Sequence, residues 1–177
     1  CWLWWGFMLV VSIGNVVLLV VSQRRRPKPG LMQPDWERTL MHIAAIVFTT
    51  VCAYRALLPR IDVTRTCWFS SPLNWILFGR LAAQVAEVCW ATQMGLLLRR
   101  LGICLAGRDL ASNRVCLRAA VSGFIVICLA FIAECWSWTN LITQNNLFAV
   151  VEQAIWSVLF LIIGIGFMLL LPCWPDR

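Results

Sequence analysis

Five long apolar runs dominate this sequence, and each is long enough to cross a lipid bilayer as a helix. They cover residues 2–22, 39–59, 75–98, 115–138 and 147–171. About 20 residues of α-helix span the roughly 30 Å of hydrocarbon in a bilayer. The sequence therefore predicts an all-α membrane protein, a bundle of about five transmembrane helices.

Polar sequence is too scarce for a separate soluble domain. Apolar residues make up 61% of the chain and charged residues only 13%, whereas about a quarter of a typical soluble domain is charged. We therefore expect one transmembrane domain over residues 1–177. The chain begins with Cys1, directly before an apolar run without the charged start of a signal peptide. We accordingly expect a fragment of a longer chain with further N-terminal sequence.

The basic residues are distributed unequally between the loops. Those after the second and fourth runs hold only Arg60 and Arg65. The other loops and the tail hold Arg24, Arg25, Arg26, Lys28, Arg38, Arg99, Arg100, Arg108, Arg114 and Arg177. The positive-inside rule therefore places the N-terminus outside and the C-terminus inside. Since these residues form no long basic face, the net charge of +7 indicates membrane orientation, and we predict no nucleic-acid partner.

The third run carries the polar residues that most need an explanation. Arg80, Gln84 and Glu87 are spaced by four and then three residues, so they project from one face of a helix. Isolated charges inside a bilayer cost several kcal/mol, and such residues normally face protein, water or an opposite charge. We therefore expect this face to border a polar site.

Four charged residues from four runs are predicted to lie at a similar depth. Arg80 is five residues from Trp75, or about 8 Å along a helix. Glu152 lies five residues into its run, and Glu134 and Arg55 lie four residues from the ends of theirs. This outer layer contains two positive and two negative groups, a pattern that permits mutual neutralisation. Purely structural pairing between helices explains it as well as ligand binding does, and Glu134 and Arg55 can also extend to the interface.

Glu87 is predicted to lie roughly 10 Å deeper than Arg80, with Gln84 between them on the same face. No basic residue is predicted at the same depth, so we select Glu87 as the leading candidate for a functional residue. The full candidate set shares one property, polarity within an apolar run. The predicted ligand- or proton-binding residues are Arg55, Arg80, Gln84, Glu87, Glu134, Glu152 and Gln153.

Several kinds of chemistry lack their sequence signatures. His42 is the only histidine, which rules out a bis-His haem within this chain and an HExxH zinc site. No GxSxG, Walker A or GxGxxG motif occurs, and no two of the nine cysteines have CxxC spacing. We therefore name no metal or cofactor and expect no enzyme activity. A membrane enzyme acting on a lipid or quinone, with Glu87 as acid or base, stays a minor alternative.

Two functions remain in balance. The first is small-ligand binding or proton-linked transport through the intramembrane Arg/Glu/Gln site. The alternative is a non-catalytic structural subunit of a larger multi-subunit membrane complex. Five spans are few for a complete transporter. The eleven tryptophans are typical of a membrane protein, because tryptophan is enriched at the membrane–water interface. Besides the lipid bilayer, we thus expect other membrane subunits or further copies of the chain as partners. The sequence does not specify which membrane.

Short signals predict details of packing and helix ends. Gly79 with Ala83, and Ala119 with Gly123, have the small-xxx-small spacing that allows close helix contact. Gly164 and Gly166 suggest a close-packed point in the last run. Ser112 or Asn113 is predicted to cap the fourth helix, and the adjacent asparagines 145 and 146 favour a turn or cap before the fifth.

Overall fold

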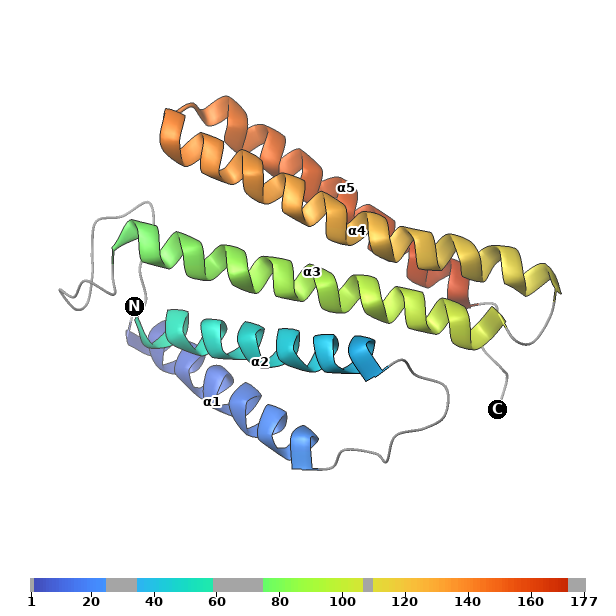
Figure 1. Cartoon of the computed structure of the whole chain (residues 1–177). Coiled ribbons are helices and arrows are strands. Elements are labelled where there is room, and N and C mark those ends of the chain that lie inside the picture. Colours follow the sequence, from blue (N-terminus) through green and yellow to red (C-terminus); the bar gives the residue numbers. More distant parts are fainter. Residues whose placement is uncertain (1, 25–34, 59–74, 107–109, 172–177) are drawn as a thin grey trace. The chain divides into compact units, whose positions relative to one another are not determined.

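The computed structural model describes residues 2–24, 35–58, 75–106 and 110–171, and these are almost entirely helical. The elements, in chain order, are α1 (Trp2–Arg24), α2 (Asp35–Leu57), α3 (Ile76–Ala106), α4 (Leu110–Thr143) and α5 (Asn146–Leu170) (Figure 1). The all-α fold and the five helices predicted from the apolar runs are confirmed.

Four of the helices are long and apolar enough to cross a membrane. Judged by length and composition, the candidate spans are Trp36–Leu57, Leu77–Ile103, Leu117–Thr143 and Asn146–Leu170. Within α1 the described apolar stretch is shorter, Gly6–Ser22. A multi-pass membrane protein is therefore supported by four helices, while the first span and the orientation of the termini stay predictions.

Two helices extend further than the apolar runs indicated. The segment after residue 98 was predicted to be a connection, but α3 continues to Ala106 and α4 already begins at Leu110. The prediction that Ser112 or Asn113 caps the fourth helix is consequently wrong. Apolar runs mark the part of a helix that suits lipid, whereas the helix itself continues where no breaker intervenes. Residues 99–106 contain no proline and are rich in the good helix formers Arg and Leu.

A two-residue turn joins α4 to α5. Gln144 has a φ of 56°, the only positive φ of a non-glycine residue in the described ranges. Asn145 has extended backbone and caps α5, because its side-chain oxygen accepts a hydrogen bond from the N–H of Leu147 at 3.0 Å. The cap predicted from the adjacent asparagines is therefore confirmed, and it sets α4 and α5 antiparallel.

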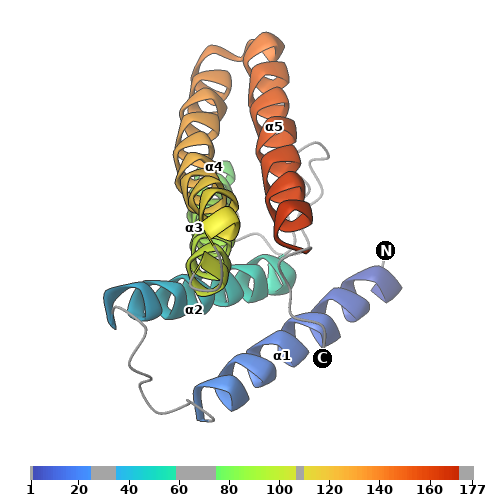
Figure 2. The same ribbon diagram turned by 90° about the vertical axis from the view of Figure 1, so that its right-hand side faces the viewer.

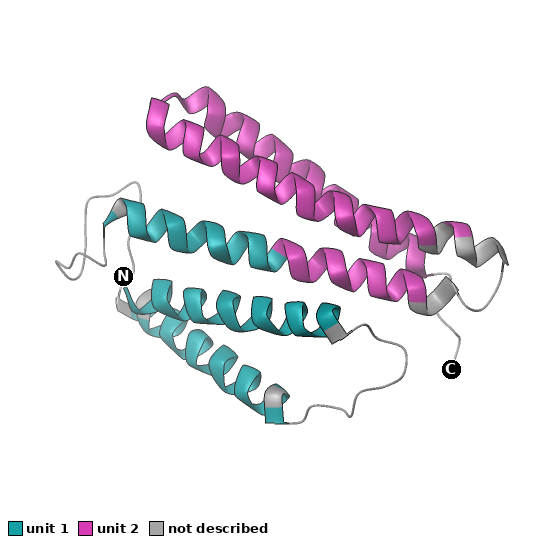
Figure 3. Cartoon of the chain, viewed as in Figure 1, with its two compact units in different colours: residues 1–90 teal, residues 91–177 magenta. Residues whose placement is uncertain are grey.

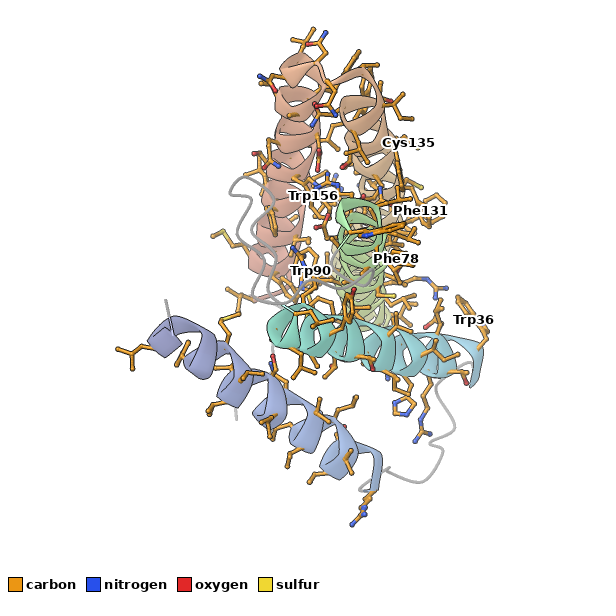
Figure 4. All side chains as sticks on the ribbon, turned by 90° about the vertical axis from the view of Figure 1, so that its left-hand side faces the viewer. Trp36, Phe78, Trp90, Phe131, Cys135 and Trp156 are labelled. Atoms are coloured by element: carbon orange, nitrogen blue, oxygen red, sulfur yellow. The ribbon has the colours of Figure 1, made fainter. Side chains whose placement is uncertain are left out.

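The chain contains two compact units, Cys1–Trp90 and Ala91–Arg177, whose boundary falls inside α3 (Figure 3). In the first unit α1 packs against α2, and Ala44 and Ala56 of α2 are buried. Trp36 is exposed at the beginning of α2 (Figure 4). The single transmembrane domain predicted from composition stays a prediction.

The second unit holds the last part of α3 with α4 and α5, and the latter two lie side by side (Figure 2). Its core includes Leu98, Val126 and Leu159, which are fully buried. The backbones of α3 and α4 approach each other at Gly95 and Gly123, where a Cβ atom on either residue would meet the carbonyl oxygen of the other. Leu98 also packs against α5, since a Cβ atom at Gly166 would lie 3.1 Å from its Cδ2. Three helices therefore share this core.

Candidate functional site

Buried polar side chains identify the candidate site. In the described residues the buried polar or charged side chains are Glu37, Gln84, Glu134, Ser137 and Glu152. Glu134, Ser137 and Glu152 belong to the second unit and to the α4–α5 hairpin. We call these three residues the buried carboxyl cluster.

Helical periodicity explains why the cluster faces inward. The buried residues of α5 are spaced by three or four and form one stripe: Glu152, Trp156, Leu159, Ile163, Gly166 and Leu170. On α4, Ser137 continues an inward stripe that includes Val126, Ala130 and Ala133, and Glu134 borders it. Because residues three and four apart share a helix face, apolar packing of each stripe carries its polar members into the core.

The hairpin sets the heights of the three residues. Ser137 lies six residues before Thr143 at the end of α4, and Glu152 lies six residues after Asn146 at the start of α5. Both are thus about 9 Å from the turn, with Glu134 less than one helical turn further along α4. The rings of Trp136 and Phe148 stack with centroids 5.4 Å apart, which shows that the helices pack together at this end. Glu134, Ser137 and Glu152 therefore occupy one layer.

Burial is close to complete for all three. Glu134 is 6% exposed, Glu152 5% and Ser137 0%. The Ser137 hydroxyl has no hydrogen-bond partner among the described residues. Carboxyl oxygens bind protons and small cations, and a hydroxyl can donate one hydrogen bond and accept others. The layer thus offers oxygen ligands and a free hydroxyl inside apolar surroundings.

The remaining candidates from the sequence lie in different settings. On α3, Gln84 is buried while Arg80 and Glu87 are half-buried, and the continuous helix puts all three on one face as expected. Arg55 is exposed in the last turn of α2, and Gln153 is exposed on α5. The structure buries Glu134 and Glu152 at similar heights in the hairpin; their predicted grouping with the residues of α2 and α3 stays a prediction.

Sequence reasoning missed two buried polar residues. Ser137 lies three residues after Glu134, a spacing that could have marked it as a neighbour on the same side of α4. Glu37 lies in the first turn of α2, where a carboxylate suits the helix dipole. It is nevertheless only 2% exposed. Burial of Glu37 is not readable from its position in the sequence.

Metal-binding residues do not gather in the described parts of the chain. There, no three His, Cys, Asp or Glu side chains form a group that could hold a metal ion, and Cys52, Cys89, Cys128 and Cys135 form no disulfide bond. No family model, curated protein or solved structure matches this chain. Its function is therefore inferred from the chemistry of its own residues.

Proposed function

We propose that this chain is a multi-pass membrane protein with an intramembrane polar site. In this proposal the small ligand of the site is the proton, and proton binding is part of proton-linked transport. The observation that supports this proposal is the buried carboxyl cluster, which places two carboxyl groups and an unpartnered hydroxyl in one layer of the α4–α5 hairpin. Arg80, Gln84 and Glu87 of α3 are proposed as further binding residues, because they are polar within an apolar run.

The cost of burying charge favours proton binding. A carboxylate in apolar surroundings is destabilised unless it is paired or neutralised. In the proposed site a bound proton lowers the charge of the buried carboxyl groups of Glu134 and Glu152, and exchange of this proton is the step that transport uses. A proton needs no preformed cavity. Glu87 is proposed as a second proton-binding residue, because an ionisable side chain within a membrane span is a functional candidate.

The proposed topology has five spans, with α1 as the first, the N-terminus outside and the C-terminus inside. The loop charges support this orientation. The loops and tail on the predicted inner side hold ten basic residues, whereas the loops on the predicted outer side hold two. The carboxyl cluster, near the turn between α4 and α5, then lies close to the outer face.

Proton flux into liposomes tests the proposal. The purified protein is reconstituted into vesicles that contain a pH-sensitive dye. A pH gradient is then imposed across the membrane, while potassium and valinomycin clamp the membrane voltage. We expect wild-type flux above that of protein-free vesicles, and an at least tenfold lower excess flux for Glu134→Gln and Glu152→Gln. Ser157→Ala is the matched control, because this exposed α5 hydroxyl donates to the backbone oxygen of Gln153, away from the cluster.

Folding of each variant is checked by its elution profile in detergent. If the glutamine variants do not fold, wild-type protein is treated with dicyclohexylcarbodiimide, an apolar reagent that modifies protonated carboxyl groups; the proposal requires that it stops the flux. Wild-type flux equal to that of empty vesicles contradicts the proposal. Co-purification with other membrane chains in fixed stoichiometry, without flux, favours the structural-subunit alternative instead.

A further inference from the structure

Charge is separated along the second unit. Its described basic residues are Arg99, Arg100, Arg114 and Arg118, and its described acidic residues are Glu134 and Glu152. Glu134 follows Arg118 by sixteen residues of the same helix, or about 24 Å. The Glu134 carboxyl group is therefore too far along α4 to neutralise Arg118.

The contact between α3 and α4 gathers arginines from both helices at the same end. Arg99 follows Gly95 by four residues and Arg118 precedes Gly123 by five, so both lie about 6–8 Å from the contact. The direction is the same for both because the helices are antiparallel there: a Cβ atom at Gly123 would lie 3.4 Å from the backbone nitrogen of Arg99. This end of the unit is consequently basic.

One face of α4 combines exposed arginines with exposed apolar side chains. Arg114, Arg118, Val121 and Ile125 are spaced by four, three and four residues, so they form one stripe. Both arginines are exposed, Val121 is 51% exposed and Ile125 41%. Two like charges four residues apart on a helix repel each other. An anion bound between them would remove this repulsion.

We propose that an anionic phospholipid binds to this stripe of α4. Its headgroup phosphate accepts hydrogen bonds from the Arg114 and Arg118 guanidinium groups, a geometry in which arginine binds phosphate particularly well. One acyl chain lies along Val121 and Ile125, further toward the membrane interior. Basic residues at the end of a membrane helix are attracted to anionic lipids, and the apolar continuation of the stripe selects a lipid over a soluble anion. This site is separate from the proposed proton site.

Thermal unfolding in nanodiscs tests the lipid site. The protein is placed in discs of phosphatidylcholine alone or with one-fifth phosphatidylglycerol, and the melting midpoint is measured. We expect phosphatidylglycerol to raise the wild-type midpoint by at least 5 °C. Arg114→Gln with Arg118→Gln should lose most of this rise. Arg24→Gln with Arg25→Gln, which removes the same amount of charge from another part of the sequence, should keep it.

Two outcomes overturn the proposal. Equal losses in both double variants show a general effect of net charge, and an equal midpoint rise from inorganic phosphate added to phosphatidylcholine discs shows a soluble anion. If the α4 double variant does not fold, Arg118→Gln alone replaces it, and about half of the rise is then expected. An unchanged rise in that variant also contradicts the site.

Discussion

Ser137 is the residue whose environment departs most from ordinary packing. Its side chain is fully buried and its hydroxyl has no hydrogen-bond partner among the described residues. Leaving a buried polar group unsatisfied costs about 1–3 kcal/mol. Serine and threonine in helices usually avoid this cost by donating to the carbonyl four residues earlier, as Ser122, Thr139 and Ser157 do here. An exception at a similar height to two buried carboxyl groups supports a part for this hydroxyl in the proposed proton site.

The substitution Ser137→Ala tests this interpretation. Removing the unsatisfied hydroxyl should raise stability by about 1 kcal/mol, while proton flux should fall because the cluster loses a hydrogen-bonding group. Stability is measured by thermal unfolding in detergent and flux in liposomes. Ser122→Ala is the matched control on the same helix: its hydroxyl donates to the Arg118 carbonyl oxygen at 2.8 Å, so flux should not change. Lower stability of Ser137→Ala with normal flux would show a purely structural hydroxyl.

At the scale of elements, close contact between α3 and α4 depends on glycine at two positions. A Cβ atom at Gly95 would lie 2.8 Å from Cγ1 of Ile127 and would also meet the Gly123 backbone. Backbone cannot move aside as a flexible side chain can, so the helices would have to separate. The small-xxx-small spacing of Ala119 and Gly123 predicted a close approach here. At Gly79, by contrast, no atom lies within 4 Å of an added Cβ.

Alanine substitutions should lower stability at glycines that contact a neighbouring helix and not at glycines that face open space. Gly95→Ala and Gly123→Ala should each lower stability by about 1–3 kcal/mol, the usual cost of overpacking. Gly164→Ala should not lower it, because an added Cβ meets nothing within 4 Å and alanine favours helix by up to about 1 kcal/mol. Melting midpoints in one detergent provide the comparison. A midpoint for Gly95→Ala equal to that of Gly164→Ala would contradict the packing of α3 on α4.

At the scale of the whole molecule, apolar side chains cover much of the described surface. Phe124, Phe131 and Met168 are among the many large apolar side chains that are more than half exposed. Exposed apolar area of this extent is a liability in water, but it is what a protein embedded in lipid requires. By contrast, the carboxyl groups of Glu134 and Glu152 are buried inside the second unit.

The orientation predicted from the loop charges has a direct test. An epitope tag at the C-terminus should resist protease added to sealed, right-side-out membrane vesicles, because the positive-inside rule places this end inside. The tag should be lost once the vesicles are opened by detergent, which controls for its intrinsic sensitivity. Immunoblotting measures both. Removal of the tag from sealed vesicles would reverse the predicted topology.

Local properties of the chain account for what sequence alone could predict. A long apolar run has to be helical in lipid, because only a helix pairs its backbone groups within one segment, and this determined all five helices. The Asn145 cap likewise depends only on neighbouring residues. The polarity of Glu134 and Glu152 within apolar runs was enough to select them as candidates. Helix ends were predicted less well, since α3 and α4 continue beyond the runs that suit lipid.

Tertiary structure alone decided which polar side chains are buried. Ser137 and Glu37 resemble many other polar residues in the sequence, and only the packing of neighbouring helices removes them from solvent. It also distinguished Gly166, where an added Cβ atom would meet Leu98, from Gly164, where an added Cβ atom would meet no other helix within 4 Å. The physical reason is that backbone pairing and apolar character are properties of one segment, whereas burial exists only once a second segment is in place. The sequence by itself therefore determined a chain of five helices, most of them suited to cross a membrane, and the α4–α5 hairpin determined that two of its carboxyl groups and a hydroxyl are buried at similar heights.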